Sequence, residues 1–217
     1  MTPLIGDGKG RYKVHVIGNS ASHSSSSFGA RVGTGKSTTG TALAALLGVP
    51  YVALDRLYWE PGWKETPFDE FQAKIRKALD QSDKGWVVDG SYSEKGGNMV
   101  LEECTDMIWL DPPLLLYFPR IFIRTMSRLF GSTATCSPDC PETFSEVFFS
   151  KNSILWWCLS HHWRYRKRGK ARLREFGIEN GTNEQRRIMR RFGGWGGKLK
   201  IWLNDVESMV AGRQKVA

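Results

Sequence analysis

The run Gly33-Thr34-Gly35-Lys36-Ser37-Thr38 limits what this chain can fold into more than any other feature of its sequence. A β-type stretch, Tyr12–Ile17, comes before it and ends at Gly18, and a helix-forming stretch, Thr39–Leu47, follows it. In that context a glycine-rich turn points backbone N–H groups at phosphate oxygens, a lysine bridges the β and γ phosphates, and a serine hydroxyl holds Mg²⁺. The residues predicted to bind nucleotide are Gly18, Gly33, Thr34, Gly35, Lys36, Ser37 and Thr38.

A serine-rich insertion, residues 21–32 (ASHSSSSFGARV), interrupts this loop. Without it, Gly18-Asn19-Ser20 would join Gly33 and complete the pattern G-x-x-x-x-G-K-S; with it, Ala30 stands at the first glycine position. Doubling a loop costs only about 0.6 kcal/mol, so we expect the fold to survive. The phosphate cradle is more sensitive, because it needs consecutive amides in a fixed curve. Either Ala30–Ser37 rebuild the loop, or the protein is an impaired P-loop protein, or the insertion comes from a splice variant or a faulty gene model.

Short β-type runs alternate with helical patterns along the chain, which is typical of a parallel sheet covered on both faces. With 217 residues and 41% hydrophobic content, the chain is long enough for one substantial core. We therefore predict a single α/β domain, residues 1–217, of the P-loop NTPase class. The expected strands are Tyr12–Ile17, Tyr51–Leu54, Trp86–Val88, Met107–Leu110 and Lys198–Leu203.

Two further local features are predicted from the pattern. Thr66 is expected to cap a helix whose residues Phe68, Phe71, Ile75 and Leu79 lie on one buried face. The glycine-rich residues 1–9 are expected to form a loose terminus.

Positive charge is concentrated in the second half of the chain. The formal net charge is +9, and residues 115–200 carry 17 Lys/Arg against 6 Asp/Glu, whereas residues 1–114 carry 12 against 14. A basic half suits a polyanionic ligand such as a phosphate, a nucleic acid or an acidic membrane surface. The most apolar run, Leu114–Ile123, is short and broken by Pro119, so we expect no membrane span. Four cysteines and the lack of a signal-peptide pattern at the start indicate a reducing, cytoplasmic compartment.

Two aspartates follow predicted strands. Asp89 closes the run Trp86-Val87-Val88, where a carboxylate beside a phosphate-binding loop would hold Mg²⁺ through water; the alternative is a turn aspartate before Gly90. Asp55 follows Tyr51–Leu54, where it could contact the hydroxyl of an acceptor substrate, cap the next helix, or do both.

Arg120, Arg124 and Arg128 recur at four-residue spacing and would form one stripe of a helix that begins near Leu114. Like charges at that spacing destabilise a helix unless an anion lies between them, so the stripe suggests a phosphate clamp; the alternative is a solvated face. Further on, residues 129–192 read as a basic, lid-like helical region.

Within that region, His161–Arg168 mixes aromatic and cationic side chains. Such a segment could close over ATP, stack on nucleic-acid bases, or be a solvated helix. Cys136 and Cys140, with His161 and His162, have an unusual spacing for zinc, and free lid cysteines are the simpler interpretation.

Over roughly residues 11–210 the chain resembles adenylate-kinase-related P-loop kinases that are often labelled DNA topology modulation proteins. The resemblance implies a sheet of order 2-3-1-4-5, ATP and phosphate binding by Arg120 and Arg124, and an acceptor contact by Asp55. It also implies that basic lid residues among Arg164, Arg166 and Arg168 close over the phosphates. The motifs that carry it are GNS…GTGKST, Leu46–Tyr51, Leu54–Trp59, Pro61–Trp63, Trp86–Ser93, Trp109–Pro113 and Ser153–Trp157.

Together these features predict an ATP- and Mg²⁺-dependent phosphotransferase that acts on a small-molecule or nucleotide acceptor. Lys36 would bridge the phosphates, Ser37 and Asp89 would organise Mg²⁺, and Arg120 and Arg124 would stabilise the transferring charge. The alternative from another class is a nucleic-acid-binding regulator that uses the basic half.

Overall fold

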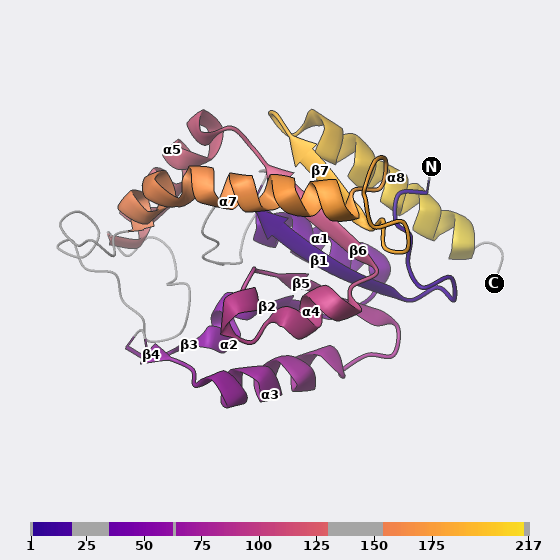
Figure 1. Ribbon diagram of the computed structural model, residues 1–217, viewed down its shortest axis with the longest axis horizontal. Coiled ribbons are helices and arrows are strands. Elements are labelled where there is room, and N and C mark those ends of the chain that lie inside the picture. The colour runs from indigo at the N-terminus through magenta and orange to yellow at the C-terminus, as the bar shows by residue number, and fades with distance from the viewer. Residues whose placement is uncertain (1, 19–34, 63, 130–153, 215–217) are drawn as a thin grey trace.

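The computed structural model describes residues 2–18, 35–62, 64–129 and 154–214, and for 124, 125, 128, 129, 154–158 and 214 it describes the backbone alone (Figure 1). Five strands form one parallel sheet in the order β2-β5-β1-β6-β7. Counted along the chain among these five, the order is 2-3-1-4-5, so the predicted α/β architecture is confirmed and is compatible with a P-loop NTPase-like fold. The strands are β1 (Tyr12–Gly18), β2 (Tyr51–Ala53), β5 (Gly85–Asp89), β6 (Asp106–Asp111) and β7 (Met189–Gly193). A separate antiparallel pair joins β3 (Trp59–Glu60) to β4 (Lys64–Glu65).

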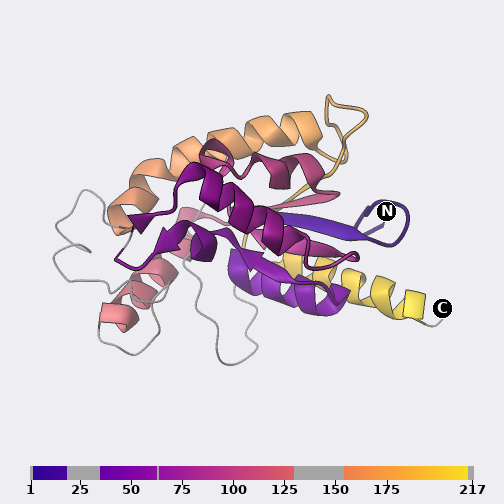
Figure 2. The same ribbon diagram turned by 90° about the horizontal axis from the view of Figure 1, so that it is seen from below.

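Helices cover both faces of the sheet. Figures 1 and 2 show α1 (Lys36–Leu47) and α8 (Gly197–Gln214) on one face, and α3 (Phe68–Leu79), α4 (Asn98–Glu103) and α7 (Ile154–Phe176) on the other. The remaining helices are α2 (Leu54–Tyr58), the 3₁₀ turn η1 (Ser93–Lys95) and α5 (Leu114–Leu129). No helix within the described ranges is long and apolar enough to cross a membrane.

Side chains alternate along β1 and divide the core into two clusters. Val14 and Val16 pack with Leu43 of α1 and Leu199 of α8, while Ile17 faces the opposite cluster under α3, α4 and α7. The central strands are buried throughout, because helices lie on both sides of them. The carboxyl ends of β5, β1 and β6 are thereby held side by side at one edge of a rigid layer.

The predicted strand Lys198–Leu203 is wrong, because this segment begins helix α8. Its buried residues Leu199, Trp202 and Val206 recur at helical spacing, whereas Ile201 is 64% exposed. The fifth strand is β7, which pairs with β6. Its sequence, MRRFG, contains adjacent arginines that hide the β pattern.

Thr66 does not cap α3. The helix begins after Pro67 without a side-chain cap, and the Thr66 hydroxyl instead lies 2.9 Å from the Tyr58 carbonyl oxygen, to which it donates. Phe71 and Ile75 are buried as predicted, as is Leu79, but Phe68 is 55% exposed.

The first residues are docked against the sheet rather than loose. Leu4 is buried, and the carboxylate of Asp106 accepts hydrogen bonds from the backbone N–H groups of Ile5 (2.7 Å) and Gly6 (2.9 Å). The Trp202 indole donates to the Pro3 carbonyl over 2.8 Å. Composition alone does not predict this docking, because the residues that bind the first segment lie about a hundred residues or more away in the chain.

Candidate functional site

Three of the predicted site residues meet where α1 begins and β5 ends. The Ser37 hydroxyl donates to Asp89 Oδ2 over 2.8 Å, and Lys36 Nζ lies 4.0 Å from Asp89 Oδ1. Lys36 is 8% exposed and Asp89 is 2% exposed, so the charges are held away from bulk water. We call these three residues the Lys36 cluster.

Tyr51 belongs beside this cluster, although its sequence position gives no sign of it. Its hydroxyl donates to Asp89 Oδ2 over 3.0 Å. Tyr51 pairs with Val87, two residues before Asp89, so both side chains leave the sheet on the same face. Burial and the negative charge of Asp89 raise the pKa of Tyr51 far above its usual value, so the hydroxyl stays a donor at any working pH.

Asp89 Oδ1 has no hydrogen-bond partner among the described residues. Burying a carboxylate oxygen without a hydrogen-bond partner costs free energy, and a cation bound at this atom would reduce that cost. A divalent cation such as Mg²⁺ takes oxygen ligands and keeps several waters beside one or two protein groups. Ser37 and Asp89 fit that pattern. No group of three or more His, Cys, Asp or Glu side chains that could hold a metal ion occurs in the described ranges.

Gly18 is required by the path of the lysine side chain. A Cβ atom at position 18 would lie 2.9 Å from Lys36 Cδ and 3.2 Å from the Leu110 carbonyl oxygen. Gly35 is the N-cap residue of α1, and Thr38 is exposed in its first turn. Gly33 and Thr34 lie outside the described residues, as does the insertion 21–32, so their roles remain predictions.

Asp55 is buried at the carboxyl end of β2 but does not cap α2, because Ala53 holds the N-cap position. The Tyr92 hydroxyl donates to Asp55 Oδ1 over 2.5 Å. Burial first, and then Asp55, raises the pKa of Tyr92 far above its usual value. Tyr92 packs against Tyr58 and Phe71, which fixes the direction of this bond.

The arginine stripe stands on α5 as predicted, but its geometry is only partly described. Arg120 is exposed, whereas the side chains of Arg124 and Arg128 lie outside the described residues. A phosphate clamp formed by Arg120 and Arg124 therefore remains a prediction.

Two of the predicted lid arginines form ion pairs. Arg166 Nε lies 3.3 Å from Asp111 at the end of β6, and Arg168 lies 2.6 Å from Glu94. Arg191 of β7 binds the same Asp111 carboxylate through Nε at 2.9 Å. Arg164 is exposed. The Arg166 pair attaches α7 to the end of β6, and the Arg168 pair attaches it to η1. The lid interpretation stays a prediction because residues 130–153 are outside the described ranges.

The zinc alternative and the interpretation as free lid cysteines both stay predictions. Cys136 and Cys140 lie outside the described residues. His162 is buried, and its Nδ1 lies 2.5 Å from the Tyr117 hydroxyl. Burial, followed by the charge of Arg166, lowers the pKa of His162.

A buried histidine of β1, on the face of the sheet opposite to α1, supports the end of β5. His15 Nε2 lies 2.6 Å from the Gly90 carbonyl oxygen, which can only accept, so Nε2 carries the hydrogen. Burial first, and then the nearby cations Arg172 and Lys36, lower the pKa of His15 to about 4. His15 thus holds the residue that follows Asp89 and stays neutral near pH 7.

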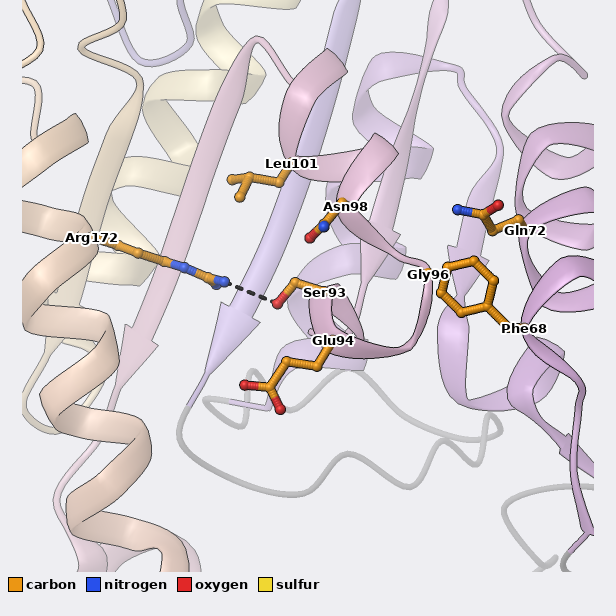
Figure 3. Close-up of a pocket in the computed structure, with 8 residues that line it drawn as sticks. All are labelled: Phe68, Gln72, Ser93, Glu94, Gly96, Asn98, Leu101 and Arg172. Atoms are coloured by element: carbon orange, nitrogen blue, oxygen red, sulfur yellow. Dashed lines mark hydrogen bonds between the residues drawn. The ribbon is translucent and has the colours of Figure 1, made fainter.

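A groove of about 460 Å³ lies beside this strand end, between α7 and η1 (Figure 3). Arg172 reaches across it from α7, with NH2 3.1 Å from the Ser93 hydroxyl and NH1 3.5 Å from the Ser91 hydroxyl. The lining residues are Phe68, Gln72, Ser93, Glu94, Gly96, Asn98, Leu101 and Arg172.

Comparisons with known proteins do not assign the chain to a family. No model of a protein family matches it, and no curated protein matches it. It is similar to a solved structure of an uncharacterized protein from Eubacterium ventriosum ATCC 27560, with 14% sequence identity over 92% of this chain and 96% of that one. The TM-score of 0.35 is too low for this similarity to support any conclusion about fold or function.

Proposed function

We propose that this protein is an ATP- and Mg²⁺-dependent phosphotransferase that acts on a small-molecule or nucleotide acceptor. The observation that carries the proposal is the Lys36 cluster. It combines a buried lysine, a hydroxyl and a carboxylate at the start of a helix and the end of a parallel strand, and one carboxylate oxygen has no hydrogen-bond partner among the described residues. As part of the same proposal, the protein is related to adenylate-kinase-like P-loop kinases and acts in the cytoplasm.

Each residue of the cluster has a role in this reaction. The N-terminus of α1 carries a partial positive charge and unsatisfied N–H groups, which attract phosphate. Lys36 adds a full charge for the β and γ phosphates, and its burial strengthens that attraction. Ser37 and Asp89 would hold Mg²⁺, which when bound neutralises phosphate charge and aligns the γ phosphate for transfer.

In this proposal, Asp55 and the arginines of α5 act on the acceptor and on the phosphoryl group that it receives. Asp55 would orient the acceptor hydroxyl, with Tyr92 fixing the carboxylate by the 2.5 Å hydrogen bond. Arg120 and Arg124 would stabilise the charge that develops on the transferring phosphoryl group.

A phosphoryl-transfer assay tests the proposal. Purified protein is incubated with γ-labelled ATP, Mg²⁺ and a panel of nucleosides, nucleotides, sugars and hydroxy acids, and label on the acceptor is measured. We expect transfer to at least one acceptor class, and loss of that transfer in the Lys36→Met variant. Absence of transfer to every class, or equal transfer by the variant, would contradict the proposal.

The same assay separates the alternatives. A version without residues 21–32 is run in parallel, and activity confined to that version would identify the full chain as an impaired P-loop protein. A nucleic-acid-binding regulator would instead bind duplex DNA with a steep salt dependence and would need no acceptor.

A further inference from the structure

The groove between α7 and η1 holds an arginine with an unusual set of partners. Among the described residues, Arg172 hydrogen bonds to two serine hydroxyls and forms no ion pair with a carboxylate. Arg168, one turn earlier on the same helix, is already paired with Glu94 at 2.6 Å. Arg172 is half-buried, so its charge is only partly solvated. A guanidinium in that position can still form a two-point bond with an oxyanion.

The surroundings of Arg172 suit a small polar molecule. Figure 3 shows Arg172 pointing from α7 toward Ser93, with Asn98 next to that serine and Gln72 on the far side of η1. Hydroxyl and amide groups are the usual orienting groups of a small-molecule site. Burial and the nearby charge of Arg168 lower the pKa of Arg172, an electrostatic cost that a bound anion would relieve.

The groove lies next to the Lys36 cluster. Ser91 is two residues beyond Asp89, so their Cα atoms are at most about 7.6 Å apart. The charges of both Lys36 and Arg172 reach His15 and lower its pKa, which places the two cations near the same imidazole. The Arg172 end of the groove is therefore the end near the Lys36 cluster.

We propose that this groove binds the oxyanion end of the phosphoryl acceptor, a phosphate monoester or a carboxylate, with Arg172 as its anchoring cation. The inference rests on the proposed phosphotransferase function and narrows the acceptor to an anionic metabolite or nucleotide. Ser91 and Ser93, which now accept from Arg172, would turn their hydroxyl hydrogens toward the anion. Phe68, 55% exposed at the far end of the groove, offers an apolar surface for the rest of the acceptor.

Calorimetry with inorganic phosphate and with acetate tests the site at constant ionic strength. The Lys36→Met background removes the lysine that would bind phosphate at the other site. In it we compare Arg172→Gln with Arg174→Gln, a matched loss of charge at an exposed position of the same helix. We expect binding to weaken at least about tenfold in Arg172→Gln, a loss in the range of a charged hydrogen bond, and to be retained in Arg174→Gln. A preference for phosphate over acetate would indicate a phosphate monoester, and the reverse a carboxylate.

Equal binding by the two variants, or no binding of either anion by Arg174→Gln, would overturn the inference. If Arg172→Gln does not fold, Arg172→Lys replaces it, because it keeps the charge but loses the two-point geometry and should still bind more weakly. Mg·ATP binding is measured on Arg172→Gln with Lys36 intact and should be unchanged. Loss of phosphate binding beside normal Mg·ATP binding supports the groove, whereas absence of Mg·ATP binding in every version reports failure of the proposed function itself.

Discussion

The hydroxyl of Tyr51 donates to Asp89 Oδ2 over 3.0 Å, from the first residue of the strand next to β5. Ser37 donates to the same oxygen over 2.8 Å, so both hydroxyl donors converge on Oδ2 and leave Oδ1 without a hydrogen-bond partner among the described residues. This arrangement fixes the carboxylate and directs its remaining oxygen toward the lysine. Tyr51 is therefore expected to be a positioning residue for cation binding.

Replacing Tyr51 by Phe removes one of the two donors without changing the shape of the core. Because a hydrogen bond to a charged group contributes about 1.5–3 kcal/mol, we expect affinity for Mg·ATP to fall at least about tenfold. The Mg²⁺ concentration needed for half-maximal binding should rise as well, which a purely structural role would not produce. Tyr12→Phe is the control, since Tyr12 pairs with Gly85 at the opposite end of β5 from Asp89, and its hydroxyl contacts Met209 Sδ at 3.8 Å. Unchanged Mg²⁺ dependence in Tyr51→Phe would refute the positioning role.

Gly40 makes room for the Tyr51 ring. A Cβ atom at position 40 would lie 2.7 Å from Tyr51 Cε2, closer than such atoms pack. Gly40→Ala gains about 1 kcal/mol of helix propensity but forces overpacking that costs about 1–3 kcal/mol, so we expect a net loss of stability. Gly212→Ala in α8, where nothing lies within 4 Å, should be stabilised instead. Urea unfolding of both variants checks this, and a Gly40→Ala protein as stable as Gly212→Ala would contradict it.

His15 should make the protein less stable in mild acid. Its pKa is lowered to about 4 in the folded protein, below the ordinary value of 6.5, so the folded state disfavours protonation. The stabilising effect of the neutral ring is complete above pH 6.5 and is lost as pH falls toward 4, by about 3 kcal/mol in total. Urea unfolding between pH 4 and 7 should show a flatter profile for His15→Gln than for the unaltered protein. The same slope in both proteins would rule out this role, and His161→Gln serves as the control.

Asp111 attaches the long helix α7 to the sheet. Its side chain is 1% exposed and binds both Arg166 and Arg191. Removing one partner of a buried ion pair costs about 3–5 kcal/mol, but solvent around the two arginines, which are 32% and 36% exposed, reduces this toward about 2 kcal/mol. We therefore expect Asp111→Asn to lower the free energy of unfolding by about 2 kcal/mol. A loss no larger than that of the exposed control Asp205→Asn would contradict the attachment.

Local pattern was enough to predict four of the five strands of the sheet and the Lys36 cluster. Lys36, Ser37 and Asp89 follow from the order strand, loop, helix and strand, because parallel strands end at the same edge of a sheet. Tyr51 was not predictable, since its role depends on the strand register against Val87 and on the space left by Gly40.

Elements at the end of the chain were harder to predict. Lys198–Leu203 alternates apolar and polar residues over too short a window to separate a strand from a helix, and the buried Val206 that decides the matter lies beyond it. Arg172 was missed because an arginine in a basic helix resembles its neighbours, and only the fold places it across from Ser93.

Affinity for Mg·ATP, measured by calorimetry on the full chain and on Lys36→Met, is the decisive measurement for the role of the Lys36 cluster in nucleotide binding. Lys200→Met is the matched control, because Lys200 is exposed on α8. We expect micromolar-range binding by the full chain and by the control, and binding weakened by at least about tenfold in Lys36→Met because a charged hydrogen bond is lost. Equal affinity of Lys36→Met and the full chain, or no binding by the full chain, would contradict this expectation.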